Sequence, residues 1–76
     1  MVKISPVHYR QLVKIFEKEG WRYIRIKGSH LVFEKPGFLR PVIILKYRQV
    51  PVFVIKNNLR TANISKEKYL KLLKEV

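Results

Sequence analysis

The chain has 76 residues, enough for one domain over residues 1–76 with one thin hydrophobic core. It carries 17 Lys and Arg against 5 Asp and Glu, a formal charge of +12, so a polyanion is the expected partner. The absence of cysteine excludes disulfides and Cys-based zinc sites, and neither a membrane span nor the apolar stretch of a signal peptide is present. We therefore expect a cytoplasmic protein with no metal, no cofactor and no membrane partner.

A helix is predicted near the start of the chain. Ser5-Pro6 provides a capping hydroxyl followed by proline, which favours a helix beginning at Pro6. The apolar residues that follow share the spacing of one helix face: Tyr9, Leu12, Val13 and Phe16. Gly20 is predicted to end this helix as a left-handed cap, because glycine adopts that conformation without steric cost.

Three β-strands are predicted in the next part of the chain, at residues 21–27, 30–34 and 41–46. The first alternates and is rich in aromatic and β-branched residues, and the third contains a continuous apolar run. Gly28-Ser29 is the predicted turn between the first two strands. Pro36-Gly37 occupies the central positions of a predicted type II turn. Because these loops are short, the strands should form an antiparallel meander.

Two helices are predicted to complete the chain. Pro51 should open the first of them, and Asn63 should end it in the left-handed conformation. Its apolar face comprises Val52, Ile55, Leu59 and Ala62. Ser65 should cap the last helix, whose apolar stripe comprises Tyr69, Leu72, Leu73 and Val76. The pair Phe53-Val54 could equally extend a strand.

The predicted order of elements is α-β-β-β-α-α. This order specifies an α+β fold in which a three-stranded antiparallel sheet carries the helices on one face and leaves its other face partly open. Such an arrangement is typical of double-stranded-RNA-binding-like domains, here with one extra short helix.

The stretch Lys27-Gly28-Ser29-His30 places one of the two histidines at the junction of two predicted strands. Histidine titrates near neutral pH and can move protons, so this position is a candidate for acid–base chemistry on a bound polyanion. The alternative interpretation is a tight turn followed by a surface histidine. His8, which belongs to no motif, is expected to be solvated or to cap a helix.

Two segments of the chain resemble the HicA family of mRNA interferase toxins, also called YcfA-like. Residues 20–30 are similar to the family's G-aromatic…K-G-S-H segment. Residues 58–65 are similar to its L-x-x-A-G-[IL]-S helix end, with Asn63 in place of the usual glycine. The order of elements and the length agree as well, so the resemblance covers nearly the whole chain.

The resemblance implies a double-stranded-RNA-binding-like fold, ribonuclease action on mRNA that stops translation, and neutralisation by a HicB-type antitoxin. The family's catalytic histidine corresponds to His30. Many members carry a second histidine in a P-V-H segment after the third strand, where this chain has Leu45-Lys46-Tyr47. This departure implies that another group acts there or that the protein is less active.

Cleavage of RNA requires no metal, because its 2′-hydroxyl is a built-in nucleophile. His30 would then be the base, Gly28 would let a phosphate approach the backbone closely, and Ser29 would donate hydrogen bonds to it. The cations expected to bind RNA are Arg25, Lys27, Lys46, Arg48, Lys56 and Arg60.

Four aromatic side chains have two possible roles each. Trp21 and Tyr23 could stack on bases, but Trp21 directly follows the helix cap, which favours a core position. Tyr69 belongs to an apolar stripe and is also expected in the core. Tyr47 could act as an acid or stack on a base. A structural or stacking role is favoured for Tyr47, because tyrosine is a poor acid–base group at neutral pH.

Two other functions are compatible with the sequence. The first is a non-catalytic RNA- or DNA-binding module of the same fold. The second is a protein-interaction domain whose basic surface meets an acidic partner. An acidic HicB-like protein encoded by a neighbouring gene would favour the toxin interpretation over the binding module.

Overall fold

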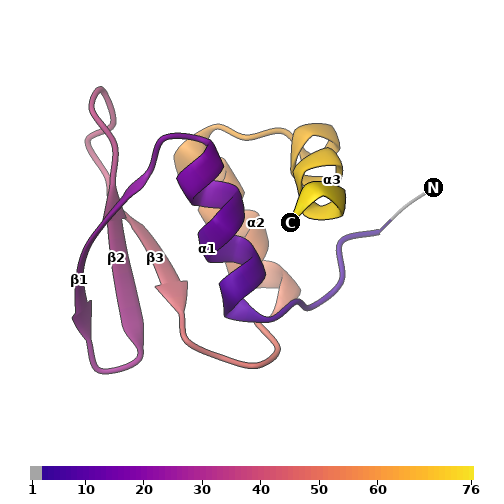
Figure 1. Ribbon diagram of the computed structural model, residues 1–76, viewed down its shortest axis with the longest axis horizontal. Helices are drawn as coiled ribbons and strands as arrows, with labels where there is room; N and C mark the ends of the chain where they lie inside the picture. Colours follow the sequence, from indigo (N-terminus) through magenta and orange to yellow (C-terminus); the bar gives the residue numbers. More distant parts are fainter. Residues whose placement is uncertain (1–2) are drawn as a thin grey trace.

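The computed structural model describes residues 3–76 and has the predicted order of elements (Figure 1). These are α1 (Tyr9–Lys18), β1 (Arg22–Lys27), β2 (His30–Glu34), β3 (Val42–Leu45), α2 (Val52–Ala62) and α3 (Lys66–Glu75). The strands form one antiparallel sheet in the order β1-β2-β3. Helices α1 and α2 pack against β3, and α3 packs against α1. The predicted α+β class and three-stranded antiparallel sheet are confirmed.

The start of α1 differs from the prediction. The helix begins at Tyr9 and not at Ser5-Pro6, and His8 is its N-cap: the His8 Nδ1 accepts a hydrogen bond, at 3.2 Å, from the backbone N–H two residues further on. Val7 lies in a β-bridge with Val50, whose N–H donates to the Val7 carbonyl at 2.7 Å. A contact distant in sequence therefore overrides the local helix signal. The capping role considered for His8 is confirmed.

The end of α1 is the predicted left-handed glycine. Gly20 has a φ of 90°. Its N–H donates to the Glu17 carbonyl at 3.1 Å, and the Trp21 N–H donates to the Phe16 carbonyl at 2.9 Å. This pair of bonds is the Schellman motif, which satisfies the last carbonyls of a helix. The motif also turns the Trp21 side chain into the core, where it is 2% exposed.

Both tight turns lie where they were predicted, and both have glycine in the left-handed region, which the predicted type II turn required of Gly37. Gly28 has a φ of 62° between β1 and β2, and Gly37 has a φ of 89° in the turn before β3. The Phe38 N–H donates to the Lys35 carbonyl at 3.1 Å, which together with the positive φ makes this a type II turn. The bounds of β1 and β3 lie within one residue of the prediction, and those of β2 agree with it.

The last two helices begin and end at the predicted signals. Pro51 is the N-cap of α2, so Phe53-Val54 lies in a helix and not in a strand. Asn63 follows α2 with a φ of 56°. The Ser65 Oγ accepts a hydrogen bond from the Lys68 N–H at 3.1 Å and caps α3. These signals succeed because each acts on backbone groups that are close in sequence.

The hydrophobic core lies between the sheet and the helices. Side chains from every element except the edge strand β1 contribute to it, among them Leu12, Phe16, Phe33, Ile44, Ile55, Leu59 and Tyr69. The core positions predicted for Trp21 and Tyr69 are confirmed. The sheet face that carries Leu31 and Phe33 is covered by helices, which leaves the opposite face as the open one.

The Tyr69 hydroxyl is buried without a hydrogen-bond partner among residues 3–76, and burial raises the pKa of Tyr69 from 10.0 to about 12. The folded state therefore holds this proton more tightly than the unfolded chain, so stability should fall as pH rises from about 10 to about 12. Over this pH range, the Tyr69→Phe variant should lose roughly 2 kcal/mol less unfolding free energy than the wild type. At neutral pH it should leave the free energy of unfolding unchanged or slightly higher, because an unsatisfied hydroxyl is removed. Urea unfolding of the wild type and of Tyr69→Phe, at neutral pH and at about pH 12, measures these free energies. If the two proteins lost the same unfolding free energy at alkaline pH, the prediction would be contradicted.

Candidate functional site

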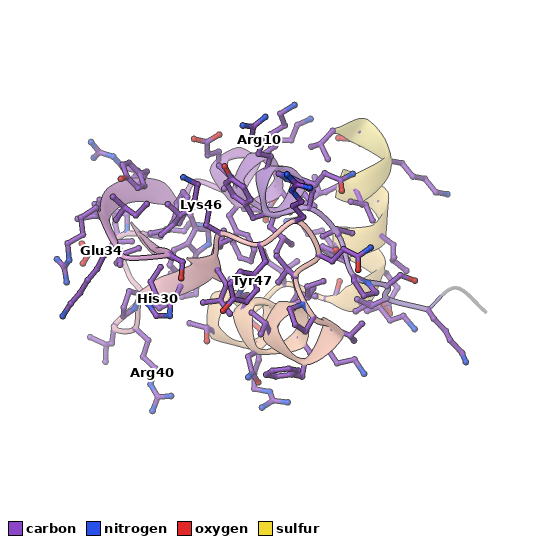
Figure 2. All side chains as sticks on the ribbon, turned by 90° about the horizontal axis from the view of Figure 1, so that it is seen from below. Arg10, His30, Glu34, Arg40, Lys46 and Tyr47 are labelled. Atoms are coloured by element: carbon purple, nitrogen blue, oxygen red, sulfur yellow. The ribbon has the colours of Figure 1, made fainter. Side chains whose placement is uncertain are left out.

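His30 is the first residue of β2, the central strand of the sheet. It lies opposite Lys27 of β1 and Leu45 of β3. The Lys46 N–H donates to the Ser29 carbonyl at 2.8 Å, which ties the turn before His30 to the segment after β3. Figure 2 labels the side chains of His30 and Lys46. The backbone of His30 is therefore held by both neighbouring strands, while the residue itself is exposed.

A β-bulge at Ile24 decides which side chains of β1 share a face with His30. Tyr23 is paired with Phe33, a core residue, whereas Arg25 is paired with Val32 on the open face. In a regular strand, residues two positions apart point to the same side of the sheet. The extra residue in β1 breaks this alternation. The bulge thus places Arg25 on the open face and keeps Tyr23 on the helix side.

The open face contains a shallow hollow of about 300 Å³ beside His30. It is lined by Arg25, Lys27, His30, Val32 and Ile43. Val32 and Ile43 lie opposite each other on adjacent strands and supply its apolar part, while the other three residues carry nitrogen groups. No carboxylate of the described residues lines it. Apolar surface bordered by cations and an imidazole suits a phosphate-bearing ligand.

The His30 side chain has no hydrogen bond and no ion pair within residues 3–76. Both ring nitrogens can therefore face a ligand in the hollow. An imidazole so placed can take a proton from a hydroxyl, while neighbouring cations stabilise negative charge that develops on a phosphate. The geometry thus permits proton transfer at a phosphate ester.

The Gly28-Ser29 turn joins Lys27 and His30, two residues that line the hollow. A Cβ built on Gly28 would meet no atom within 4 Å, so its positive φ and not crowding explains the glycine. Both turn residues are exposed. A phosphate can therefore approach the turn backbone and the Ser29 hydroxyl directly.

Only part of the predicted cation set gathers around His30. Arg25 and Lys27, both from β1, line the hollow together with His30. Helix α2 packs on the covered side of the sheet, through Ile55 and Leu59, so its cations lie apart from the open face. The remaining four are exposed outside the hollow: Lys46 and Arg48 in the segment after β3, and Lys56 and Arg60 on α2.

None of the aromatic candidates lines the hollow among the described residues. Trp21 is buried, and Tyr23 is half-exposed on the helix side of the sheet. Tyr47 is 43% exposed, and its carbonyl accepts a hydrogen bond from the Tyr9 N–H at 3.1 Å. The backbone of Tyr47 therefore holds the start of α1, whereas its side chain remains open to solvent.

Two residues of the hollow were not predicted from the sequence. Val32 and Ile43 were expected only as strand residues, yet they form the apolar surface beside His30. A signal was available, because Val32 follows His30 by two positions and must share its face in a regular strand. Ile43 requires the register between β2 and β3, which the sequence does not specify.

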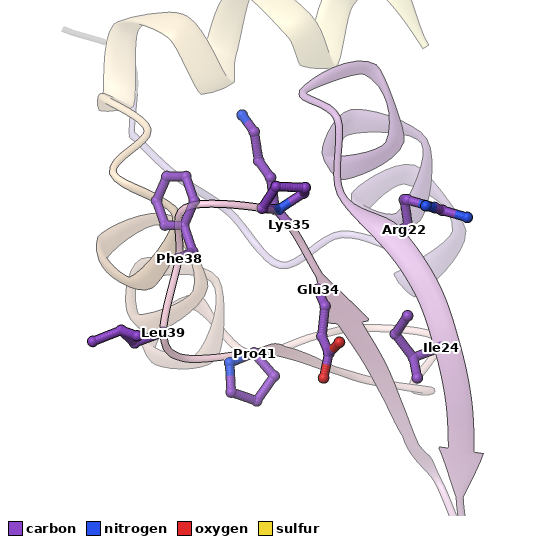
Figure 3. Close-up of a pocket in the computed structure, with 8 residues that line it drawn as sticks. Arg22, Ile24, Glu34, Lys35, Phe38, Leu39 and Pro41 are labelled. Carbon is purple, nitrogen blue, oxygen red and sulfur yellow. The ribbon is translucent and has the colours of Figure 1, made fainter.

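A second hollow, of about 470 Å³, lies at the other end of the open face beside the type II turn (Figure 3). Arg22 and Glu34 lie opposite each other at its edge on β1 and β2, and Ile24 lines it with them. Lys35 is a second cation in its lining, but the Glu34 carboxylate would repel a phosphate. This hollow is therefore less suited to a nucleic acid than the one beside His30, although it is larger.

Two further features concern residues 3–76 as a whole. None of their helices has the length and apolar character needed to cross a membrane. Within this part of the chain, no group of three or more His, Cys, Asp or Glu side chains is placed to bind a metal ion.

Comparison with protein families gives one match. The model of the family described as the HicA toxin of bacterial toxin–antitoxin systems matches residues 9–64. The match runs from the start of α1 past the end of α2, so it includes every residue of the hollow and leaves out α3. No curated protein sequence matches the chain.

Proposed function

The chain belongs to the HicA toxin family, and on this premise we propose that it is an mRNA-cleaving ribonuclease with His30 as its catalytic residue. The observation that carries the proposal is the hollow in which His30 lies beside Arg25 and Lys27, with no carboxylate among the described residues that line it. Cleavage of mRNA would stop translation. The toxin would act in the cytoplasm, where mRNA is translated.

The proposed reaction uses the hydroxyl that RNA carries. His30 takes the proton of a 2′-hydroxyl, and the resulting O2′ attacks the adjacent phosphorus. The bond from phosphorus to O5′ breaks, so one product ends in a 2′,3′-cyclic phosphate and the other in a 5′-hydroxyl. The O5′ leaving group takes a proton from water, and the hydroxide so formed takes the proton back from His30, which regenerates the neutral imidazole. No metal or cofactor enters this scheme.

The neighbours of His30 have electrostatic roles in this proposal. Arg25 and Lys27 stabilise the charge that builds up on the phosphate oxygens in the transition state. Gly28 permits close approach of the backbone, and Ser29 donates its hydroxyl and N–H to the phosphate. Ile43 supplies the apolar surface that contacts one side of the bound nucleotide, because Val32 opposite it is only 7% exposed.

A non-catalytic RNA-binding module of the same fold is the second candidate. One observation favours it: Leu45-Lys46-Tyr47 stands where many family members carry a second histidine, and Tyr47 does not line the hollow. The two functions share the basic surface and differ in whether the RNA is cut.

The purified protein should cut an in vitro transcript in the presence of EDTA. The reason is that the nucleophile comes from the RNA and the base from His30. Gel analysis should detect fragments that carry 2′,3′-cyclic phosphates. A transcript with 2′-deoxynucleotides at the cut sites should stay intact at those sites. Cleavage of the deoxy-substituted sites at the same rate would contradict the mechanism.

We further propose that a HicB-type antitoxin binds over the hollow beside His30 and silences the toxin. A family of toxin–antitoxin systems implies an antitoxin partner, and the charge of +12 favours an acidic one. Co-expression with the small neighbouring gene should yield a complex that withstands purification and does not cut RNA. If both proteins are made and do not associate, this part of the proposal is wrong.

A further inference from the structure

Three lysines from three separate segments line one hollow at the helical side of the molecule. Lys3 precedes α1, Lys56 lies in the middle of α2, and Lys66 is the first residue of α3. The hollow has a volume of about 320 Å³, and Ile4 is the fourth residue that lines it. Its lining within the described residues therefore comprises three lysines and one isoleucine, with no carboxylate residue.

The charges of this lysine cluster are not balanced by the protein. Within residues 3–76, the ion pairs are Lys18 with Glu75 at 3.4 Å and Lys68 with Glu19 at 2.7 Å. Both pairs join the C-terminal end of α1 or its cap residue to α3, and neither involves a lysine of the cluster. Like charges that share a small hollow repel one another, and a bound anion removes that repulsion.

We propose that Lys3, Lys56 and Lys66 form a phosphate-binding site that holds the backbone of the RNA substrate at a distance from His30. The role in RNA binding rests on the proposed function. Three lysine ammoniums offer point charges and donors that suit a phosphate, and the lining has no aromatic side chain that could stack on a base. The site should therefore bind the backbone without regard to sequence.

The position of the lysine cluster gives it a role different from that of the hollow beside His30. The sheet lies at one end of the longest axis, and α3 and the N-terminal segment lie toward the other (Figure 1). That axis is 34 Å long. At about 3.4 Å per nucleotide along a duplex strand, an RNA that spans the whole axis has roughly ten nucleotides, which is the upper limit of the length needed to join the two sites. The two sites should thus be occupied together only by a long substrate.

The family likeness does not supply this site. Lys3 and Lys66 lie outside residues 9–64, which match the family model, and only Lys56 lies inside them. The site depends on how the N-terminal segment and the start of α3 meet α2 in this chain.

The test compares two double variants that remove the same charge. Lys56→Ala with Lys66→Ala removes two lysines of the cluster. Lys71→Ala with Lys74→Ala, the control, removes two exposed lysines of α3 that do not line the hollow. Circular dichroism confirms that all three proteins are folded. Inorganic phosphate is titrated into each, with amide NMR shifts of Ile4 and the residues around it as the readout.

We expect saturable shifts in the wild type and in the control, and their loss in the cluster variant. For a transcript of about 30 nucleotides, the cluster variant should lower the salt slope of binding by about one per lysine, and the control by less.

Other outcomes overturn the proposal in separable ways. Equal losses of long-RNA binding in both variants would mean that general surface charge, and not this site, binds the backbone. Saturable phosphate binding with no effect on the long transcript would assign the site to free phosphate and not to RNA. If the wild type cuts no RNA, the proposed function fails, while phosphate titration and long-RNA binding still decide the inference.

Discussion

The affinity for RNA should fall about 60-fold when monovalent salt rises from about 50 to about 200 mM. The chain carries 17 Lys and Arg against 5 Asp and Glu, and the described ion pairs use only two of these cations. Each phosphate that a lysine or arginine neutralises releases counterions, which gives a slope of about −0.7 to −0.9 per contact. Several contacts therefore give a log–log slope of about −3 or steeper.

Fluorescence anisotropy of a labelled, structured RNA across a salt series measures this slope. Parallel titrations with Arg25→Ala and Lys27→Ala should each reduce the slope by about one, since each removes one phosphate contact at the hollow. An affinity that stays constant across the series would remove the electrostatic basis of RNA binding.

The ends of the helices and the turns were predictable because they depend on neighbouring residues. Gly20, Gly37 and Asn63 have positive φ where the sequence places residues that tolerate it. Ser65 caps α3 through a backbone N–H three residues away. In each case the interaction that decides the conformation spans only a few residues, so the sequence contains all of it.

The start of α1 was predicted wrongly because a distant contact decides it. Ser5-Pro6 is a valid helix start in isolation, but the bridge between Val7 and Val50 extends the chain there. Burial on the helices was also underestimated. Ile15 is fully buried, because α1 contacts both β3 and α3 and therefore buries a wider stripe than one apolar face.

The candidate site was predictable in its residues but not in their arrangement. His30, Arg25 and Lys27 were identified from the sequence, and they line one hollow. Arg25 shares a sheet face with His30 only because of the bulge at Ile24, and nothing in the neighbouring sequence indicates that bulge. Lys56 was expected to bind RNA, and it lies in a hollow apart from His30, because the choice of exposed helix face depends on packing.

Replacement of His30 by alanine should lower the rate of RNA cleavage by a factor of about 10²–10⁴. His30 is the one residue of the hollow with an imidazole, and Arg25 and Lys27 cannot replace it as a base at neutral pH. Most of the affinity should remain, because phosphate contacts come from lysine and arginine. The fold should also remain, since the His30 side chain is exposed and makes no hydrogen bond or ion pair within the described residues.

The matched histidine control must respect the capping role of His8. Its Nδ1 accepts a capping hydrogen bond from the Arg10 N–H, so His8→Ala would cost about 1 kcal/mol of stability. His8→Asn keeps a capping acceptor and should cut RNA at the wild-type rate. Tyr47→Phe tests the departure from the family pattern, and an unchanged rate would exclude the Tyr47 hydroxyl from proton transfer.

The most direct measurement is the single-turnover rate at which His30→Ala cuts a transcript, at saturating protein and beside the wild type and His8→Asn. Circular dichroism and RNA affinity are recorded on the same samples. Our account predicts three folded proteins that bind the transcript about equally, of which only His30→Ala has lost cleavage by about two orders of magnitude or more. A folded His30→Ala protein that cuts at the wild-type rate would contradict the catalytic assignment, and a wild type that binds without cutting would identify the chain as a binding module.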